Sequence, residues 1–335
     1  MLEALGIAAL VLAVVSAAFL LALVGRRMSL ARAERRRAEM EQRLKPLALA
    51  LTEHDQTDLP ALPAAELAVL ADVLGRYSRR VTGDARARIA EYFAGTEALA
   101  RELRALGDRR AWRRATAAYR LGDMACRDAG PPLIGRLSDR DADVRASAAR
   151  SLGQLRFEEA ASRLVLALVE ETVPRAIAFR ALLDIGGVAL PELRRLAGDE
   201  SADLRAAAVE LIGWVGDAAD ADLLVAAMED SSAEVRARAA ASLGRLAETE
   251  GAAALTRALD DRIYFVRLHA ARALGQVGER DAVEQLLRQA REDRFEAARA
   301  AAQAVASIDP DALLAAAELP DAGPHLHEAA DLLRI

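Results

Sequence analysis

The 335-residue chain has few of the residue types that carry disulfides, β-structure or catalysis. It contains one cysteine, Cys126, so an intramolecular disulfide is excluded, as is typical of proteins in a reducing compartment. Aromatic residues make up only 4%, and no segment shows the sustained alternation of Val, Ile or Thr that indicates strands. With 53% hydrophobic and 29% charged residues, the composition predicts an ordered, almost entirely helical protein.

One motif recurs through most of the chain. It is clearest as VRASAARSLGQL over residues 144–155, and it returns as VRARAAASLGRL from Val235 and as VRLHAARALGQVG from Val266. Each copy contains an anchor arginine, and successive anchors are 30 or 31 residues apart: Arg114, Arg145, Arg175, Arg205, Arg236 and Arg267. A period this regular predicts a solenoid of stacked units.

Each unit is predicted to be a pair of helices. Apolar or small residues fall at helical spacing from Val144 to Leu155, and a second apolar stripe lies upstream at Leu133 and Leu137. A single hairpin cannot bury both of its faces, so its stability has to come from stacking against neighbouring hairpins. We therefore predict an all-α fold, an α-solenoid of helical hairpins preceded by one transmembrane helix.

These units resemble HEAT repeats, in particular the short alanine-rich kind found in phycobilisome lyases. The resemblance implies a structural ladder between adjacent repeats, made by an Asp in the turn between the two helices and an Arg six residues on. The matching positions are Asp108 with Arg114, Asp139 with Arg145, Asp199 with Arg205, Asp230 with Arg236, and Asp261 with Arg267. Val169 stands at the Asp position before Arg175, and Glu292 stands before Ala298, so we expect those two junctions to be tied less tightly.

The first segment, residues 1–25, is predicted to be a transmembrane helix. Its apolar run carries Glu3 as the only charge, and at 1.5 Å per residue it spans about 30 Å, enough to cross the hydrocarbon core. A cleaved signal peptide is one alternative, although basic residues would then precede the run and none does. A buried core helix is the other alternative.

Residues 26–51 form a basic segment that we expect to continue as a helix beside the membrane. Eight basic residues and three glutamates give it a charge of +5, which places the N-terminus outside and the remaining chain in the cytoplasm. We interpret the charge as a topology determinant, with binding of anionic headgroups as the alternative. A linker over residues 52–63 and a solenoid over residues 64–335, with capping hairpins at both ends, complete the predicted organisation.

The sequence contains no readable catalytic, metal or cofactor site. Cys126 has no histidine near it in the sequence, and the only metal-like cluster is His325, His327 and Glu328. HEAT-type deoxyhypusine hydroxylases hold iron with several His-Glu pairs, whereas this chain has only His327-Glu328. Because the chain outside the basic segment is strongly acidic, we also expect no nucleic-acid partner.

The second helices of HEAT-like solenoids line the concave side, so residues five and nine positions after each anchor arginine are predicted to form an exposed band. Aromatic and arginine side chains, which are enriched at binding hot spots, recur there. The candidate partner-binding residues are Tyr119, Arg150, Arg180, Trp214, Arg272 and Gln276. A solvated polar face is the alternative for any one of them. Trp112 and Phe265 are expected to pack between repeats.

Together these features predict a membrane-anchored cytoplasmic scaffold or adaptor that binds a membrane-associated protein partner through the concave face. The alternative is an accessory or regulatory subunit of a membrane enzyme, or a lyase-like protein that handles a cofactor. The repeat by itself does not carry lyase chemistry. We therefore expect a non-enzymatic protein without a cofactor.

Overall fold

The computed structural model describes most of the chain. The described residues are 2–53, 62–78, 80–81, 83–247 and 249–334, without the side chains of residues 2–18, 22 and 64. Within these ranges all regular secondary structure is helical. The chain divides into two compact units, Met1–Ala129 and Gly130–Ile335, which we call unit 1 and unit 2.

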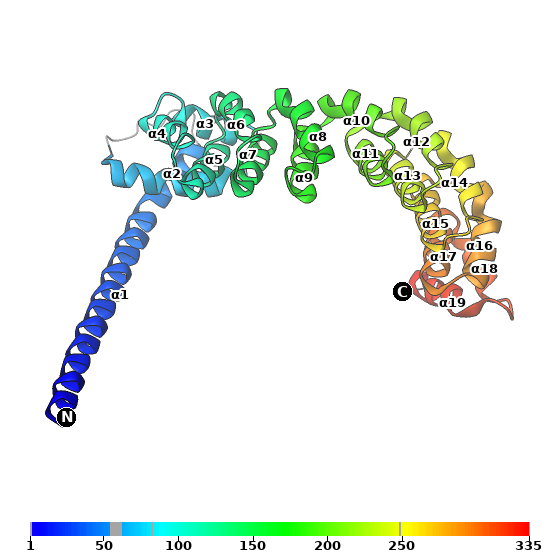
Figure 1. The fold of residues 1–335 in the computed structure, drawn as a ribbon. Coiled ribbons are helices and arrows are strands. Elements are labelled where there is room, and N and C mark those ends of the chain that lie inside the picture. The colour runs from blue at the N-terminus through cyan, green and yellow to red at the C-terminus, as the bar shows by residue number, and fades with distance from the viewer. Residues whose placement is uncertain (1, 54–61, 79, 82, 248, 335) are drawn as a thin grey trace. The chain divides into compact units, whose positions relative to one another are not determined.

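Unit 1 consists of one long helix and four short ones (Figure 1). The long helix α1, Leu2–Glu53, runs without a break through residue 25 and through Pro46. Its C-terminal part packs on α2 and α3, where Leu44, Ala48 and Leu51 are buried. The remaining elements are α2 (Ala64–Ser78), α3 (Asp84–Phe93), α4 (Glu97–Ala105), α5 (Ala111–Asp123) and a short 3-10 helix (Arg127–Ala129).

Part of the basic segment of α1 is committed to contacts with α2. Three ion pairs join the two helices: Arg37 with Asp72, Arg43 with Glu66, and Arg76 with Glu41. All three pairs are partly exposed, so each contributes little to the free energy of folding. Residues 26–36, by contrast, are exposed. The basic segment therefore has two halves with different surroundings.

Over the part of the chain that the structure describes, no helix meets the length and apolarity needed to cross a membrane. The predicted span over residues 1–25 lies largely outside the described side chains, which begin at Phe19 and omit residue 22.

Unit 2 is built from helical hairpins in which a shorter outer helix precedes a longer inner helix (Figure 1). The outer helices are α6 (Gly130–Arg136), α8 (Ala161–Val169), α10 (Leu190–Leu196), α12 (Ala221–Ala227), α14 (Ala252–Ala258) and α16 (Val283–Glu292). The inner helices are α7 (Ala142–Leu155), α9 (Arg175–Ile185), α11 (Ala202–Val215), α13 (Ala233–Leu246), α15 (Tyr264–Val277) and α17 (Phe295–Ile308). A last hairpin, α18 (Pro310–Ala317) and α19 (Gly323–Leu333), packs on α17.

Consecutive inner helices pack side by side, α7 on α9 and onward to α17. Figure 1 shows these helices on the inner side of the bend of this unit, with the outer helices on the opposite side. Five further 3-10 helices introduce outer helices: Glu158–Ala160, Gly187–Ala189, Ala218–Asp220, Thr249–Gly251 and Arg280–Ala282. The predicted all-α solenoid is confirmed for the described residues.

The alanine and glycine positions of the motif allow inner helices to approach closely. Ala148 and Ala149 of α7 are fully buried. A Cβ added at Gly153, in the last turn of α7, would lie only 2.6 Å from the Cα of Ala181 in α9. The same contact recurs along the array: Gly213 with Ser242, Gly244 with Ala273, and Gly275 with Ala304. Glycine is thus required by the separation of neighbouring backbones.

Candidate partner-binding surface

The Asp before each inner helix organises its own turn. Asp199 accepts a hydrogen bond from the backbone N–H of Ser201 at 2.8 Å, and Asp261 accepts one from Ile263 at 2.8 Å. Asp108, Asp139 and Asp230 accept the equivalent bonds from the residue two positions on. This side-chain turn sets the start of the second helix at the same place in each of these five hairpins.

The anchor arginines connect one helical hairpin to the next. Arg236 donates from Nε and Nη2 to the two carboxylate oxygens of Asp261, at 2.7 and 3.0 Å, and from Nη1 to the carbonyl of Asp230 at 2.8 Å. Arg205 binds Asp230 and the carbonyl of Asp199 in the same way. The Arg therefore contacts the backbone of its own turn and the carboxylate of the following turn. Such planar two-point pairing is the strong form of the Arg–carboxylate contact.

The two junctions expected to be weaker behave differently from each other. Where Val169 replaces the Asp, Arg145 donates to the carbonyl of Thr172 at 2.6 Å and to that of Asp139 at 2.9 Å. At the other junction Arg267 pairs with both oxygens of Asp293, the residue after Glu292. The expectation of a weak tie at this junction is corrected. Because α16 extends through Glu292, the carboxylate in the following turn is that of Asp293.

The pKa values of the ladder carboxylates Asp230 and Asp293 lie below the ordinary value of an aspartate. Burial by itself would raise the pKa of Asp293, but hydrogen bonds from Arg267 and Gln289 outweigh it and lower the pKa to about 2. The hydrogen bond from Arg205 lowers the pKa of Asp230. Because the folded state binds the proton less tightly than the unfolded chain does, these groups stabilise the fold at neutral pH.

We expect Asp293 to make unfolding pH-dependent. Its contribution is complete above about pH 5, where the unfolded carboxyl is almost fully ionised, and is lost as the pH falls through about 2. The loss amounts to about 2 kcal/mol. Urea unfolding at pH 7, 4 and 2.5 tests this: Asp293→Asn is less stable than the native chain at pH 7, and the difference shrinks at pH 2.5. Asp222→Asn, a substitution at an exposed position on α12, is the control. If the free energy of unfolding of Asp293→Asn differs from that of the native chain by the same amount at each pH, the expectation is contradicted.

The predicted partner-binding residues of unit 2 all lie on inner helices and are exposed. Arg150 is on α7, and Arg180 is on α9, where it forms an ion pair with Asp184 at 3.0 Å. Trp214 is on α11, and Arg272 and Gln276 are on α15.

Three of these residues gather around the C-terminal end of α13. The guanidinium of Arg245 lies 4.4 Å from the ring centroid of Trp214, so α11 and α13 are joined by a cation–π contact. A Cβ on Gly244 would lie 2.4 Å from Oε1 of Gln276, which places the Gln276 amide over the backbone of Gly244, the residue before Arg245. Partial burial lowers the pKa of His269, and the charge of Arg272, on the same helix, lowers it further.

Two titratable residues of this region, Arg238 and His269, were not among the predicted site residues. Arg238 forms ion pairs with Glu210 and Glu234, both at 2.8 Å, and His269 lies nearby on α15. Both stand two positions after an anchor arginine. This register is the signal that could have identified them.

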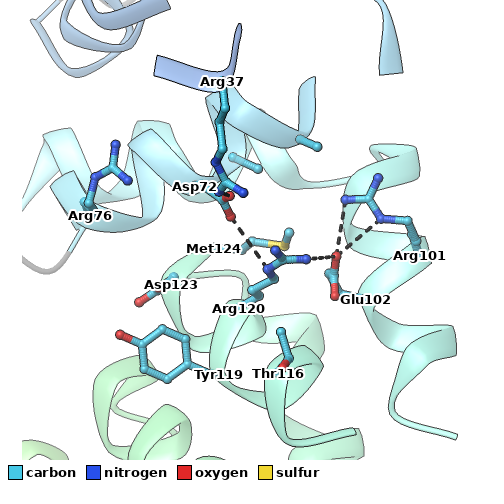
Figure 2. Close-up of a pocket in the computed structure, with 12 residues that line it drawn as sticks. Arg37, Asp72, Arg76, Arg101, Glu102, Thr116, Tyr119, Arg120, Asp123 and Met124 are labelled. Carbon is cyan, nitrogen blue, oxygen red and sulfur yellow. Dashed lines mark hydrogen bonds and ion pairs between the residues drawn. The ribbon is translucent and has the colours of Figure 1, made fainter. Parts of the chain in front are cut away.

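Tyr119, the predicted residue of unit 1, lies on α5 at a polar pocket of about 310 Å³. Figure 2 shows Arg120 reaching toward Glu102 on one side and Asp72 on the other, with N–O distances of 3.3 and 3.6 Å. Arg37 of α1 also pairs with Asp72. The pocket thus joins α1, α2, α4 and α5. No sequence pattern marked it, because its residues come from four helices with unrelated spacing.

Trp112 corrects one packing expectation. Its side chain is 63% exposed in the first turn of α5, where Arg113 stacks on it at 5.3 Å. Phe265 is half-buried and makes an edge contact with Tyr264. The expectation of packing between repeats is therefore wrong for Trp112, and for Phe265 it stays a prediction.

The residues with catalytic potential do not form a metal cluster. His327 contacts the carbonyl of Gly323, His325 packs against Phe295, and Glu328 pairs with Arg299. Throughout the described residues, no group of three or more His, Cys, Asp or Glu side chains is placed to hold a metal ion.

We expect the thiol of Cys126 to be unreactive in the folded protein. It is buried, with Sγ 3.1 Å from the carbonyl of Ala90, and burial followed by the charge of Asp128 raises its pKa to about 12. Titration with a disulfide reagent at pH 8 should label the native chain at least about 100-fold more slowly than the urea-unfolded chain. Equal rates in the two states would contradict this expectation.

The fold and the repeating ladder define an α-solenoid, and comparisons place it in a family. A profile of HEAT repeats matches residues 97–183, 170–235 and 221–306, so the chain belongs to the HEAT-repeat family. A search of curated proteins finds no match.

One solved structure supports the fold. A crystal structure of importin beta matches with 15% identity and a TM-score of 0.52, over 84% of this chain and 44% of that one. Human deoxyhypusine hydroxylase matches with 22% identity over 88% of this chain and 96% of that one, with a TM-score of 0.30. The first likeness supports a helical-repeat fold and nothing narrower, and the second carries no argument about function.

Proposed function

We propose that this protein is a scaffold or adaptor that binds a protein partner through the inner helices of its solenoid. HEAT-repeat proteins commonly bind protein partners, and repeat arrays commonly use their extended inner face. The observation that carries the proposal is the band of exposed side chains on α7 to α15. Its centre holds Trp214, which is 57% exposed beside Arg245. An exposed tryptophan flanked by arginine is typical of a binding hot spot.

The proposal includes a membrane anchor in residues 1–25, with the N-terminus outside and the solenoid in the cytoplasm. Support comes from the apolar run and from the basic residues that follow it. At the end of the run Phe19, Leu20 and Leu21 are each more than 60% exposed on α1, and apolar surface of this kind calls for a cover such as lipid. An anchor would raise the concentration of the solenoid near a membrane-associated partner.

Crosslinking in cells tests the binding proposal. The full chain is affinity-purified beside a variant with Trp214→Ala and a matched control with Trp112→Ala, which removes the other exposed tryptophan. Recovery of one protein in near-stoichiometric amount from the native chain and the control, but not from Trp214→Ala, supports the proposal. Equal recovery from all three would contradict binding at this face.

Topology is tested separately with a C-terminal reporter fusion. We expect a signal from the cytoplasmic side and membrane retention after washing with high salt. Release by salt would contradict a spanning helix, and an external reporter signal would reverse the orientation.

A further inference from the structure

Arg245 and Arg272 differ from most of the charged side chains around them on the inner helices. Arg180, Arg205, Arg236, Arg238 and Arg267 each form an ion pair with a carboxylate. Within the described part of the chain, neither Arg245 nor Arg272 forms one, and Arg245 is half-buried. Glu210, whose charge also acts on Arg245, is the ion-pair partner of Arg238.

The surroundings of these two residues hold their charges in place and leave the site electropositive. The Trp214 ring lies against the Arg245 guanidinium, and Nη1 of Arg245 is 3.3 Å from the hydroxyl of Ser242. Burial lowers the pKa of Arg245; the charge of Glu210 opposes this effect, and the charge of Arg238 adds to it. Burial also lowers the pKa of His269, with Arg272, Arg238 and Arg245 adding to the effect and Glu234 opposing it. Arg238, Arg245 and Arg272 outnumber Glu210 and Glu234, so this surface of α11, α13 and α15 carries a net positive charge.

We propose that Arg245 and Arg272, with the Gln276 amide, bind the carboxylates of an acidic segment, rich in Asp or Glu, of the partner polypeptide. This inference rests on the proposed function and specifies the chemistry of the partner. A guanidinium presents a planar set of donors that matches a carboxylate, and stacking on Trp214 orients that plane before binding.

A nucleic acid fits this surface less well than an acidic peptide. Among the described residues at this place, only Arg245 and Arg272 are free of ion pairs, whereas a phosphate backbone is bound through a run of several Lys or Arg contacts. A flexible acidic peptide needs only to place one carboxylate on each of the two arginines.

The test uses the purified full chain in a neutral detergent and fluorescein-labelled octa-glutamate as the probe. We expect saturable binding at low ionic strength that weakens about tenfold or more in Arg245→Gln and in Arg272→Gln, since each variant removes charge-assisted hydrogen bonds. Arg195→Gln removes an equal charge from the outer helix α10 and should bind within about twofold of native, since it lies away from the site. Octa-glutamine should not bind. Absence of saturable octa-glutamate binding, or equal weakening in Arg195→Gln, would overturn the proposal.

A second readout locates the site. The chain has two tryptophans, and only Trp214 stacks on a proposed ligand-binding arginine. Octa-glutamate should therefore change the intrinsic fluorescence of the native chain and of Trp112→Phe, but not that of Trp214→Phe. A change that persists in Trp214→Phe would place the acidic peptide elsewhere.

The crosslinking experiment separates the two proposals. If Arg245→Gln and Arg272→Gln capture the same partner as the native chain, the scaffold stands and the acidic-segment proposal fails. If the native chain captures no protein, the scaffold itself fails.

Discussion

Alanine in place of Gly213 is expected to lower the free energy of unfolding of the repeat array by about 2–4 kcal/mol. The new Cβ would lie 2.1 Å from Oγ, 2.3 Å from Cβ and 2.7 Å from Cα of Ser242 on α13. The last contact is to backbone, so a rotation of the Ser242 side chain cannot relieve it, and α11 and α13 have to separate. The displaced hydroxyl would also lose its buried 3.0 Å hydrogen bond to the carbonyl of Val209.

The helical preference of alanine over glycine opposes this loss by at most about 1 kcal/mol. Substitution of Gly135 by alanine measures the helical preference alone, because a Cβ at this exposed position of α6 meets nothing within 4 Å. We expect Gly135→Ala to be neutral or slightly stabilising. Urea unfolding followed by circular dichroism compares the two variants, and hydrogen exchange should show the loss of protection centred on α11 and α13.

A compensating change sharpens the comparison. Ser242→Gly in the Gly213→Ala background removes two of the three close contacts, so we expect it to restore part of the lost stability. If Gly213→Ala is as stable as Gly135→Ala, the conclusion that the inner helices are too close for a side chain at Gly213 is contradicted.

Replacing Arg236 by methionine is expected to destabilise the array by about 2–4 kcal/mol. Its side chain is only 10% exposed and that of Asp261 only 12%, so the substitution leaves a carboxylate shielded from water without its partner. The carbonyls of Asp230 and Ser231 lose their donor as well. The hydrogen bond to Asp261 raises the pKa of Arg236 despite the opposing effect of burial, which agrees with a favourable pairing in the folded state.

Arg257 provides the matched control. It pairs with Glu229 at 3.8 Å on the surface, with both side chains more than 60% exposed, and solvent screens such a pair almost completely. We expect Arg257→Met to change stability by less than about 0.5 kcal/mol. Asp261→Asn and the double variant complete a cycle whose coupling term isolates the Arg236–Asp261 pair. A coupling near zero would show that the ladder only fixes the turns.

The period of the motif predicted the hairpins, the order of inner and outer helices and the exposure of the band on the inner helices. These properties follow from local spacing, since a side chain at a given position of a helix faces the same way in each copy. The same periodicity showed that a glycine recurs near the end of each inner helix. The contact of Gly153 with the Ala181 backbone required the distance between helices, which no local pattern encodes.

Side-chain partners were set by tertiary structure. The sequence marked each Asp and the Arg six residues on as positions of a ladder between repeats, and the structure identifies the partners: Arg236 pairs with the carboxylate of Asp261, 25 residues on, and with the carbonyl of Asp230 in its own turn. The length of α16 brought Asp293 to Arg267 in place of Glu292.

The amino-acid sequence by itself determined the repeat, its helical hairpins and the face on which the candidate residues lie, because all three follow from the spacing of side chains along a helix. Tertiary structure decided which charges are neutralised and which remain available. Arg238 finds Glu210 on α11 and Glu234 on its own helix, while Arg245 stacks on Trp214. Those outcomes depend on the packing of α11 against α13, where a shift of a few ångströms separates an ion pair from an open binding site.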